Sequence, residues 1–247
     1  MHAAAPCAWA PPPPLTTTTD VPAHLLSRLL YTNPVCLLVA EVPVDGEAAP
    51  PKPRTARWTA MTISWLSALN NTGMCTLSMN ERRFTASLPA VQPGGAFTLS
   101  VPVAGMEPLV RQIGKSSGRT VDKLAAIDLC APGWGHFPPP CAADVEPPQK
   151  RMRTKRELKR MDRERAFAAL AQSTAAVRDC VVHMVLRVLS VQSVSGHRLM
   201  VCQVEFGFVR DEWWRDGKLF TASDAALPSP LTFFGSGVFG EMRMLPA

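Results

Sequence analysis

Two apolar runs near the C-terminus, CVVHMVLRVLS at 180–190 and LMVCQVEFGFV at 199–209, decide the fold class of this chain. Read with a period of two, each run places apolar side chains on one face, as β-strands do. The intervening SVSGHR contains Gly196, which predicts an antiparallel hairpin with a tight turn. On this reading His183 lies on the opposite face, as a satisfied surface or interface residue and not as a catalyst.

Working outward from this hairpin, further segments read as strands and short helices. At least six strands, mostly hairpin-linked, predict a mainly β fold, an antiparallel β-barrel decorated by three or four helices. The pattern disfavours a Rossmann domain because no regular β-α-β alternation occurs and no G-x-G-x-x-G motif follows a strand. The other predicted strands are 35–44, 58–65, 73–79, 96–103 and a short one in 230–242. The predicted short helices are 20–30, 80–90 with Asn80 as N-cap, 106–114 ended by Gly114, and the segment after the turn at 114–118. The basic segment 150–165 also carries good helix formers.

The composition describes one folded protein of a cytosolic type. The 247 residues are 47% hydrophobic, and no run of 18 apolar residues that could span a membrane occurs. The seven cysteines form no C-x-x-C pair, which is typical of reduced buried thiols. We expect a disordered Pro/Thr-rich tail at 1–20, then a single domain at 21–247 that carries a Pro-rich and basic insertion at about 131–177.

The net charge of +6 comes from one segment. Residues 150–165, KRMRTKRELKRMDRER, contain nine Lys or Arg against three Asp or Glu, so the remainder of the chain is neutral. Such a run is a candidate nuclear-localisation or RNA-binding patch. It lacks interleaved aromatic residues for base stacking, and we therefore favour a solvated helix over a nucleic-acid role.

The strand WTAMTISW at 58–65 carries bulk on both faces, yet it places hydroxyls at Thr62 and Ser64. A strand between two apolar layers accommodates a hydroxyl only if a partner satisfies it. Either nearby backbone satisfies these hydroxyls, or they face something polar that is not protein.

Between them, three segments combine hydroxyls, cations and glycine or a helix start. They are 58–65, which supplies the hydroxyls alone, and 78–85 and 114–123, which add the cations and the helix start or glycine turn. Backbone N–H groups at a helix start, with hydroxyls and a guanidinium nearby, form an anion site, above all for phosphate. Taken singly, the arginines at 82 and 83 also read as solvated charges, and Ser117-Gly118 as a turn.

In this order the motifs resemble the flavin reductase-like family, a branch of the FMN-binding split barrels. The resemblance covers roughly residues 30–130 and 178–242, and the S-G-R-x-V-D-K run about fifty residues after A-M-T-x-S-W is its most specific part. The matching segments are NPVCLLVA (33–40), TAMTISW (59–65), LSMNERRFT (77–85), GKSSGRTVDKL (114–124), GHRLMVCQVEFGFV (196–209) and FFGSGVFGEM (233–242).

The resemblance implies an antiparallel split β-barrel that binds FMN. It places Met61, Thr62, Ser64 and Trp65 along the isoalloxazine ring, Leu77 and Ser78 beside the ring or ribityl chain, Arg83 and Thr85 at the phosphate, and Ser117, Gly118, Arg119 and Lys123 closing or bracing the site, with Asp122 orienting Arg119 or Lys123. The hydroxyls of the 58–65 strand would then face the flavin. The family commonly has Asn where Thr59 stands.

The resemblance also implies hydride transfer between NADH or NADPH and the flavin, with no catalytic group required of the protein. His197 is a candidate at the nicotinamide side, although a polar hairpin tip explains it equally well. The alternative is a flavoredoxin-like electron carrier with tightly bound FMN. A homodimer in the cytoplasm, with no membrane or nucleic-acid partner and no bound metal, completes the expectation.

Overall fold

The computed structural model describes residues 33–43, 58–134, 155–215, 218–219, 227–235 and 237–241. All of them belong to one compact unit, Thr32–Ala247. The predicted tail at 1–20, the predicted helix at 20–30 and most of the Pro-rich loop after 131 lie outside the described residues.

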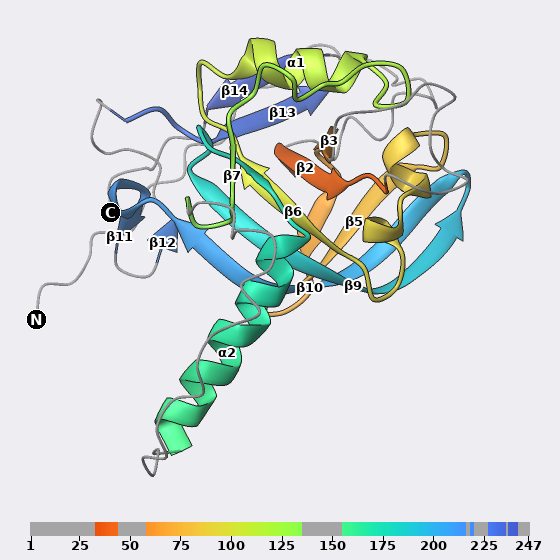
Figure 1. The fold of residues 1–247 in the computed structure, drawn as a ribbon. Coiled ribbons are helices and arrows are strands. Elements are labelled where there is room, and N and C mark those ends of the chain that lie inside the picture. The colour runs from red at the N-terminus through yellow and green to blue at the C-terminus, as the bar shows by residue number, and fades with distance from the viewer. Residues whose placement is uncertain are drawn as a thin grey trace, which may run out of the picture. The chain divides into compact units, whose positions relative to one another are not determined.

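The centre of the fold is a seven-stranded antiparallel sheet that curls into a half-barrel (Figure 1). This confirms the predicted mainly β, antiparallel split-barrel fold with short peripheral helices. The strand order is β3 (Trp58–Ile63), β2 (Cys36–Glu41), β6 (Ala96–Val101), β9 (Val182–Val194), β10 (His197–Val209), β5 (Met74–Asn80) and β4 (Leu66–Ala68).

The hairpin β9–β10 is the longest element of the sheet, as predicted. Each strand has 13 residues, and the two-residue turn is Ser195–Gly196. Both turn residues have positive φ, 47° and 76°, which matches the right-handed twist of the flanking strands. A tight turn joins the two strands, and the neighbouring strands β6 and β5 pair with the two sides of this hairpin.

The apolar run of β2 is continuous because both faces of the strand are buried. Cys36, Leu38 and Ala40 belong to a hydrophobic cluster inside the half-barrel. Val35, Leu37 and Val39 belong to a second cluster on the outer face of the sheet. The edge strand β3 has the same two-sided burial, with Ile63 in the inner cluster and Trp58 and Ala60 in the outer one.

The outer cluster is covered by helix α1 (Glu107–Lys115) and a small sheet of β1 (Asn33–Pro34), β13 (Leu231–Gly235) and β14 (Val238–Glu241). Figure 1 shows α1 beside β13 and β14, and the Arg111 guanidinium lies 5.1 Å from the centre of the Phe239 ring. Val110 and Ile113 are the buried side of α1. The helix ends at Lys115, one residue after the predicted stop.

The segment predicted to be an insertion, about 131–177, contains helix α2 (Lys155–Gln172), as the helix-forming residues of the basic segment predict. Phe167 packs against Phe206 and Phe208 of β10, with ring centroids 5.1 and 5.3 Å away. The described short strands β7 (Leu129–Cys130) and β8 (Ala176–Val177) pair with each other, and β11 (Trp214–Arg215) pairs with β12 (Lys218–Leu219).

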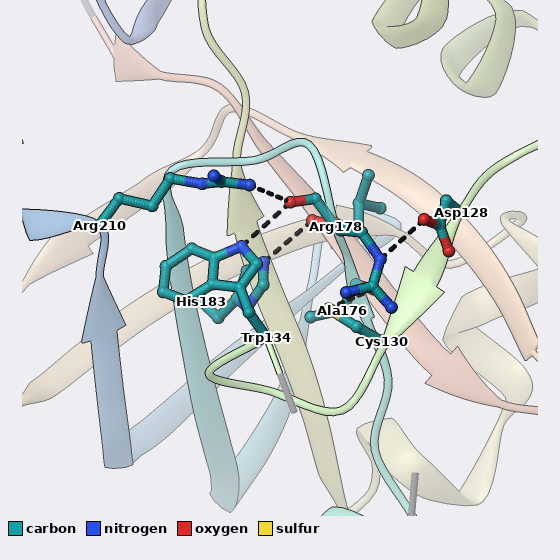
Figure 2. Close-up of polar contacts among 8 residues, drawn as sticks. Asp128, Cys130, Trp134, Ala176, Arg178, His183 and Arg210 are labelled. Atoms are coloured by element: carbon teal, nitrogen blue, oxygen red, sulfur yellow. Dashed lines mark hydrogen bonds and ion pairs between the residues drawn. The ribbon is translucent and has the colours of Figure 1, made fainter. Parts of the chain in front are cut away.

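His183 joins the two ends of this insertion to the sheet (Figure 2). The His183 Nε2 lies 2.9 Å from the Val177 carbonyl oxygen, and the Gly133 N–H donates to its Nδ1 at 3.2 Å. The Trp134 indole stacks on the imidazole, and both Trp134 Nε1 and Arg210 Nη2 donate to the Arg178 carbonyl.

The predicted surface position of His183 is therefore wrong. The side chain is fully buried, and burial lowers its pKa to about 4. The first half of β9 is covered on both faces. An alternating pattern predicts that one face of this strand is exposed to solvent, but the chain around Val177 packs on that face.

Two predicted helices are also wrong. Residues 80–90 form short 3₁₀ segments, η2 (Phe84–Ser87) and η3 (Pro89–Val91), because Leu88 precedes a proline and is extended. Residues 116–128 are turns without a helix. The Asp122 side chain accepts a hydrogen bond from the Leu124 N–H, a local bond that competes with helix formation.

Candidate functional site

A cavity of about 710 Å³ lies where β3, the C-terminal end of α1, the η2 segment and the β13–β14 hairpin meet. Its size falls in the range that holds small-molecule ligands and cofactors. The lining combines apolar side chains, hydroxyls and cations, so it suits a ligand with a flat apolar part and an anionic part.

The apolar wall comes from β3, η2, α1 and the terminal hairpin. Met61, Phe84 and Val110 line the cavity together with Ile113 and, from the hairpin, Phe233 and Phe239. The rings of Phe233 and Phe239 are 5.5 Å apart. These aromatic side chains reach the cavity only because β13 and β14 pair beside α1.

The Thr62 hydroxyl, one of those in the 58–65 strand, has a backbone partner. Its Oγ1 donates a hydrogen bond of 3.1 Å to the Val110 carbonyl of α1, so backbone satisfies it, and the residue also lines the cavity. Ser64 lies beyond the end of β3 and lines the cavity as well. The first alternative is therefore correct for Thr62.

Two cations brace the C-terminal end of α1. Lys123 Nζ donates to the Ile113 carbonyl at 2.9 Å and to the Ala60 carbonyl of β3 at 3.0 Å. Arg83 Nη1 lies 3.4 Å from the Gly114 carbonyl oxygen. Helix C-terminal carbonyls carry partial negative charge, so the cations stabilise this end and fix it against the edge strand.

The loop after α1 closes one side of the cavity at Gly118. The glycine is buried, and a Cβ added there would collide with the Thr59 hydroxyl and lie 3.0 Å from the Phe84 ring. Thr59 Oγ1 itself is buried without a hydrogen-bond partner among the described residues. Ser117 Oγ accepts the Arg119 N–H at 3.2 Å, which turns the loop.

The structure brings most of the predicted site residues together. Eight of them line the cavity: Met61, Thr62, Ser64, Arg83, Thr85, Ser117, Gly118 and Lys123. Leu77 is fully buried in the inner cluster, and the positions of Trp65, Ser78 and Arg119 are outside the lining. Contact of any of these residues with a flavin stays a prediction, as does the orienting role of Asp122.

His197 and Trp65 form a pair next to the cavity. Their ring centroids are 5.2 Å apart, and His197 pairs across the sheet with Asn80, which lines the cavity. The His197 Nδ1 is 3.3 Å from the Ser195 carbonyl oxygen. The hairpin tip therefore lies near the site, whichever explanation of His197 holds.

Sequence reasoning missed the contributions of α1 and the terminal hairpin. Arg111, Lys115, Phe233, Gly237 and Phe239 all line the cavity. The signal available was the glycine-rich FFGSGVFGEM, in which Gly237 has φ of 77°. Pairing of that turn with α1 is a long-range contact that no local pattern predicts.

FMN fits the residues that are present. The described lining residues include five cations and no Asp or Glu, and an apolar wall stands beside them. Gly118 lets the loop after α1 pack against Thr59 and Phe84, where any side chain would collide. Within the described residues no group of three His, Cys, Asp or Glu side chains could hold a metal ion. No helix in the described part of the chain is both long and apolar enough to cross a membrane.

Fold and site define the class: a split-barrel protein whose cavity suits an anionic ligand with a flat apolar part. The sequence profile described as "Flavin reductase like domain" matches residues 26–239, and the chain belongs to that family. A comparison with curated protein sequences gives no match.

Solved structures share the fold at low sequence identity. The flavoredoxin of Methanosarcina acetivorans is 15% identical with a TM-score of 0.60, covering 94% of this chain and 95% of that one. A putative flavin reductase with a split barrel domain from Shewanella frigidimarina is 10% identical with a TM-score of 0.58, covering 92% and 93%. An NADH:FAD oxidoreductase of Streptomyces globisporus is 11% identical with a TM-score of 0.56, covering 94% and 100%.

Proposed function

We propose that this chain is an FMN-binding oxidoreductase of the flavin reductase type, moving hydride between a nicotinamide and the flavin. The observation that carries the proposal is the cavity: four of its five cations and part of its apolar wall, Met61 and Phe84, come from the segments 58–65, 78–85 and 114–123 that carry the family's motifs. Family membership supports the same reaction class.

In this proposal Arg83 and Thr85, with the loop at Ser117, hold the phosphate. Met61, Thr62 and Ser64 lie along the ring. Bound flavin would supply hydride acceptance and donation, which no side chain can provide. The chain's own residues bind, orient and shield: Lys123 holds β3 and α1 at a fixed separation, and the apolar wall excludes water.

The test is an absorption spectrum of the purified protein with phosphate analysis, followed by anaerobic addition of NADH or NADPH. Flavin bands that bleach with either nicotinamide support the reductase. If the protein is colourless, an FMN titration followed by flavin fluorescence quenching takes its place. No binding in the micromolar range would overturn the proposal.

The second candidate is a flavoredoxin-like carrier with tightly held FMN, which the similarity to a flavoredoxin structure favours. The two differ in flavin release and nicotinamide access. NADH oxidation that accelerates when free FMN is added indicates a reductase of free flavin. Bound FMN that is reduced without turnover indicates a carrier.

We further propose that the chain forms a homodimer and works in the cytoplasm. Family resemblance supports the dimer. The described free cysteines, Cys36, Cys75, Cys130, Cys180 and Cys202, are all buried, and burial raises the pKa of the thiols, as suits reduced structural residues. Light scattering of the purified protein tests the dimer, and a monomer mass would contradict it.

A further inference from the structure

The cavity holds more positive charge than one phosphate monoester needs. Its described lining residues include five cations and no carboxylate. A phosphate monoester carries about −1.5 to −2 charges at neutral pH, which two cations offset. Three positive charges are therefore left over once a single phosphate is held.

The five cations fall into two groups by their contacts. Arg83 and Lys123 donate to backbone carbonyls at the end of α1, where the helix dipole offsets part of their charge. Within the described residues, the side chains of Arg82, Arg111 and Lys115 make no hydrogen bond or ion pair. The Arg111 guanidinium lies over the Phe239 ring and beside Gly237. The second group of cations therefore has no anionic partner in the described chain.

The arrangement of this second group costs stability in the absence of an anion. Arg111 and Lys115 are four residues apart on α1 and both line the cavity, and like charges at this spacing repel. Lys115 in the last turn is favoured by the helix dipole, but this does not apply to Arg111 one turn earlier. A bound anion between them would turn the repulsion into attraction.

We propose that Arg82, Arg111 and Lys115 form a subsite for a second phosphate group in the same cavity, an inference that rests on the proposed flavin function. The group recognised is a phosphate beyond the one that FMN brings. Two ligands of this reaction class carry it: a flavin dinucleotide, in its pyrophosphate, and a phosphorylated nicotinamide dinucleotide, in its 2′-phosphate. Arginine forks and a lysine ammonium suit either group.

The test compares ligand pairs that differ in phosphate. Dissociation constants for FMN and FAD, and kcat/KM for NADH and NADPH, are measured for the wild type and for a variant combining Arg82→Gln, Arg111→Gln and Lys115→Gln. The matched control is Arg165→Gln, an exposed cation of α2 outside the cavity. All substituted side chains are exposed, and circular dichroism verifies the fold.

The expected result is selective. The wild type prefers the ligand with the extra phosphate in at least one pair, and the triple variant loses about tenfold or more of that preference, because the ligand with the extra phosphate loses more affinity than its partner. Loss in the FAD/FMN pair assigns the subsite to the pyrophosphate, and loss in the NADPH/NADH pair assigns it to the 2′-phosphate. Higher salt should reduce the preference.

Two outcomes overturn the inference: no preference in either pair, or an equal loss for every ligand, FMN included, which would mean a general field. If no flavin binds at all, the proposed function fails, and titration with inorganic pyrophosphate decides the subsite alone. Pyrophosphate binding that the triple variant abolishes keeps the subsite. Absence of such binding removes it.

Discussion

The Lys123 ammonium reaches the C-terminal end of α1, where its Nζ donates a hydrogen bond of 2.9 Å to the Ile113 carbonyl oxygen. A second bond, of 3.0 Å, goes to the Ala60 carbonyl of β3. One side chain thus joins the edge strand and the helix that form two walls of the cavity. Edge strands have unpaired backbone carbonyls, and the Lys123 ammonium donates to one of them, that of Ala60.

Substituting Lys123→Met should loosen this junction. Hydrogen bonds to a charged group contribute about 1.5–3 kcal/mol, and two backbone carbonyls lose their partner. We expect the free energy of unfolding to fall by roughly 2 kcal/mol and FMN affinity to fall with it, measured by urea denaturation and fluorescence titration. The matched control is Lys115→Met, whose ammonium makes no hydrogen bond in the described chain. Equal stability of both variants would rule out the bracing role.

Gly118→Ala should damage the site by crowding. The new methyl group would meet the Thr59 hydroxyl and the Phe84 ring, which are both buried. Overpacking of this kind costs about 1–3 kcal/mol, and a displaced loop would also weaken flavin binding. Gly207→Ala is the control, because nothing lies near its added Cβ. Adding Thr59→Ala, which removes the hydroxyl, should recover part of the loss, and the absence of any recovery would locate the strain elsewhere.

Acid should weaken the fold through His183. Burial lowers its pKa from 6.5 to about 4, with Arg210 and Arg178 contributing in the same direction. Between these values the unfolded chain binds more protons than the folded one, so stability is fully present above about pH 6.5 and falls by roughly 3 kcal/mol toward pH 4.

Urea denaturation at about pH 7 and about pH 4.5 checks this, comparing the wild type with His183→Gln. The variant should be less stable at neutral pH, because the bonds to Val177 and Gly133 weaken, and its stability should change less with pH. An identical pH dependence in both proteins would show that His183 does not titrate on unfolding.

Local patterns predicted the sheet well, and the reasons are visible in β2 and in the β9–β10 hairpin. A continuous apolar run predicts a strand buried on both faces, and Gly196 predicts the turn. The same reasoning failed at 80–90, where Pro89 holds the preceding residue extended. It also failed at 116–128, where the Asp122 side chain accepts a backbone hydrogen bond and competes with helix formation. Both segments have the composition of helices, but the proline in one and the side-chain hydrogen bond in the other prevent helix formation.

The site was predictable only in part, for a related reason. The segments that carry Met61, Arg83 and Gly118 have recognisable motifs, and the structure places them around one cavity. The opposite wall depends on the packing of α1 against the β13–β14 hairpin. That contact joins residues more than a hundred positions apart, so no periodicity or turn signal within either segment contains it.

Whether the cavity binds FMN is decided by comparing FMN binding by the wild type and by Arg83→Ala, followed by anaerobic reduction with NADH or NADPH. The wild type should show a flavin spectrum, or bind FMN with micromolar or tighter affinity, and its flavin should bleach when a nicotinamide is added. Arg83→Ala should weaken FMN binding about tenfold or more, because the phosphate loses a guanidinium partner. A wild type that binds no FMN, or an Arg83→Ala variant that binds it equally well, would contradict the proposed site.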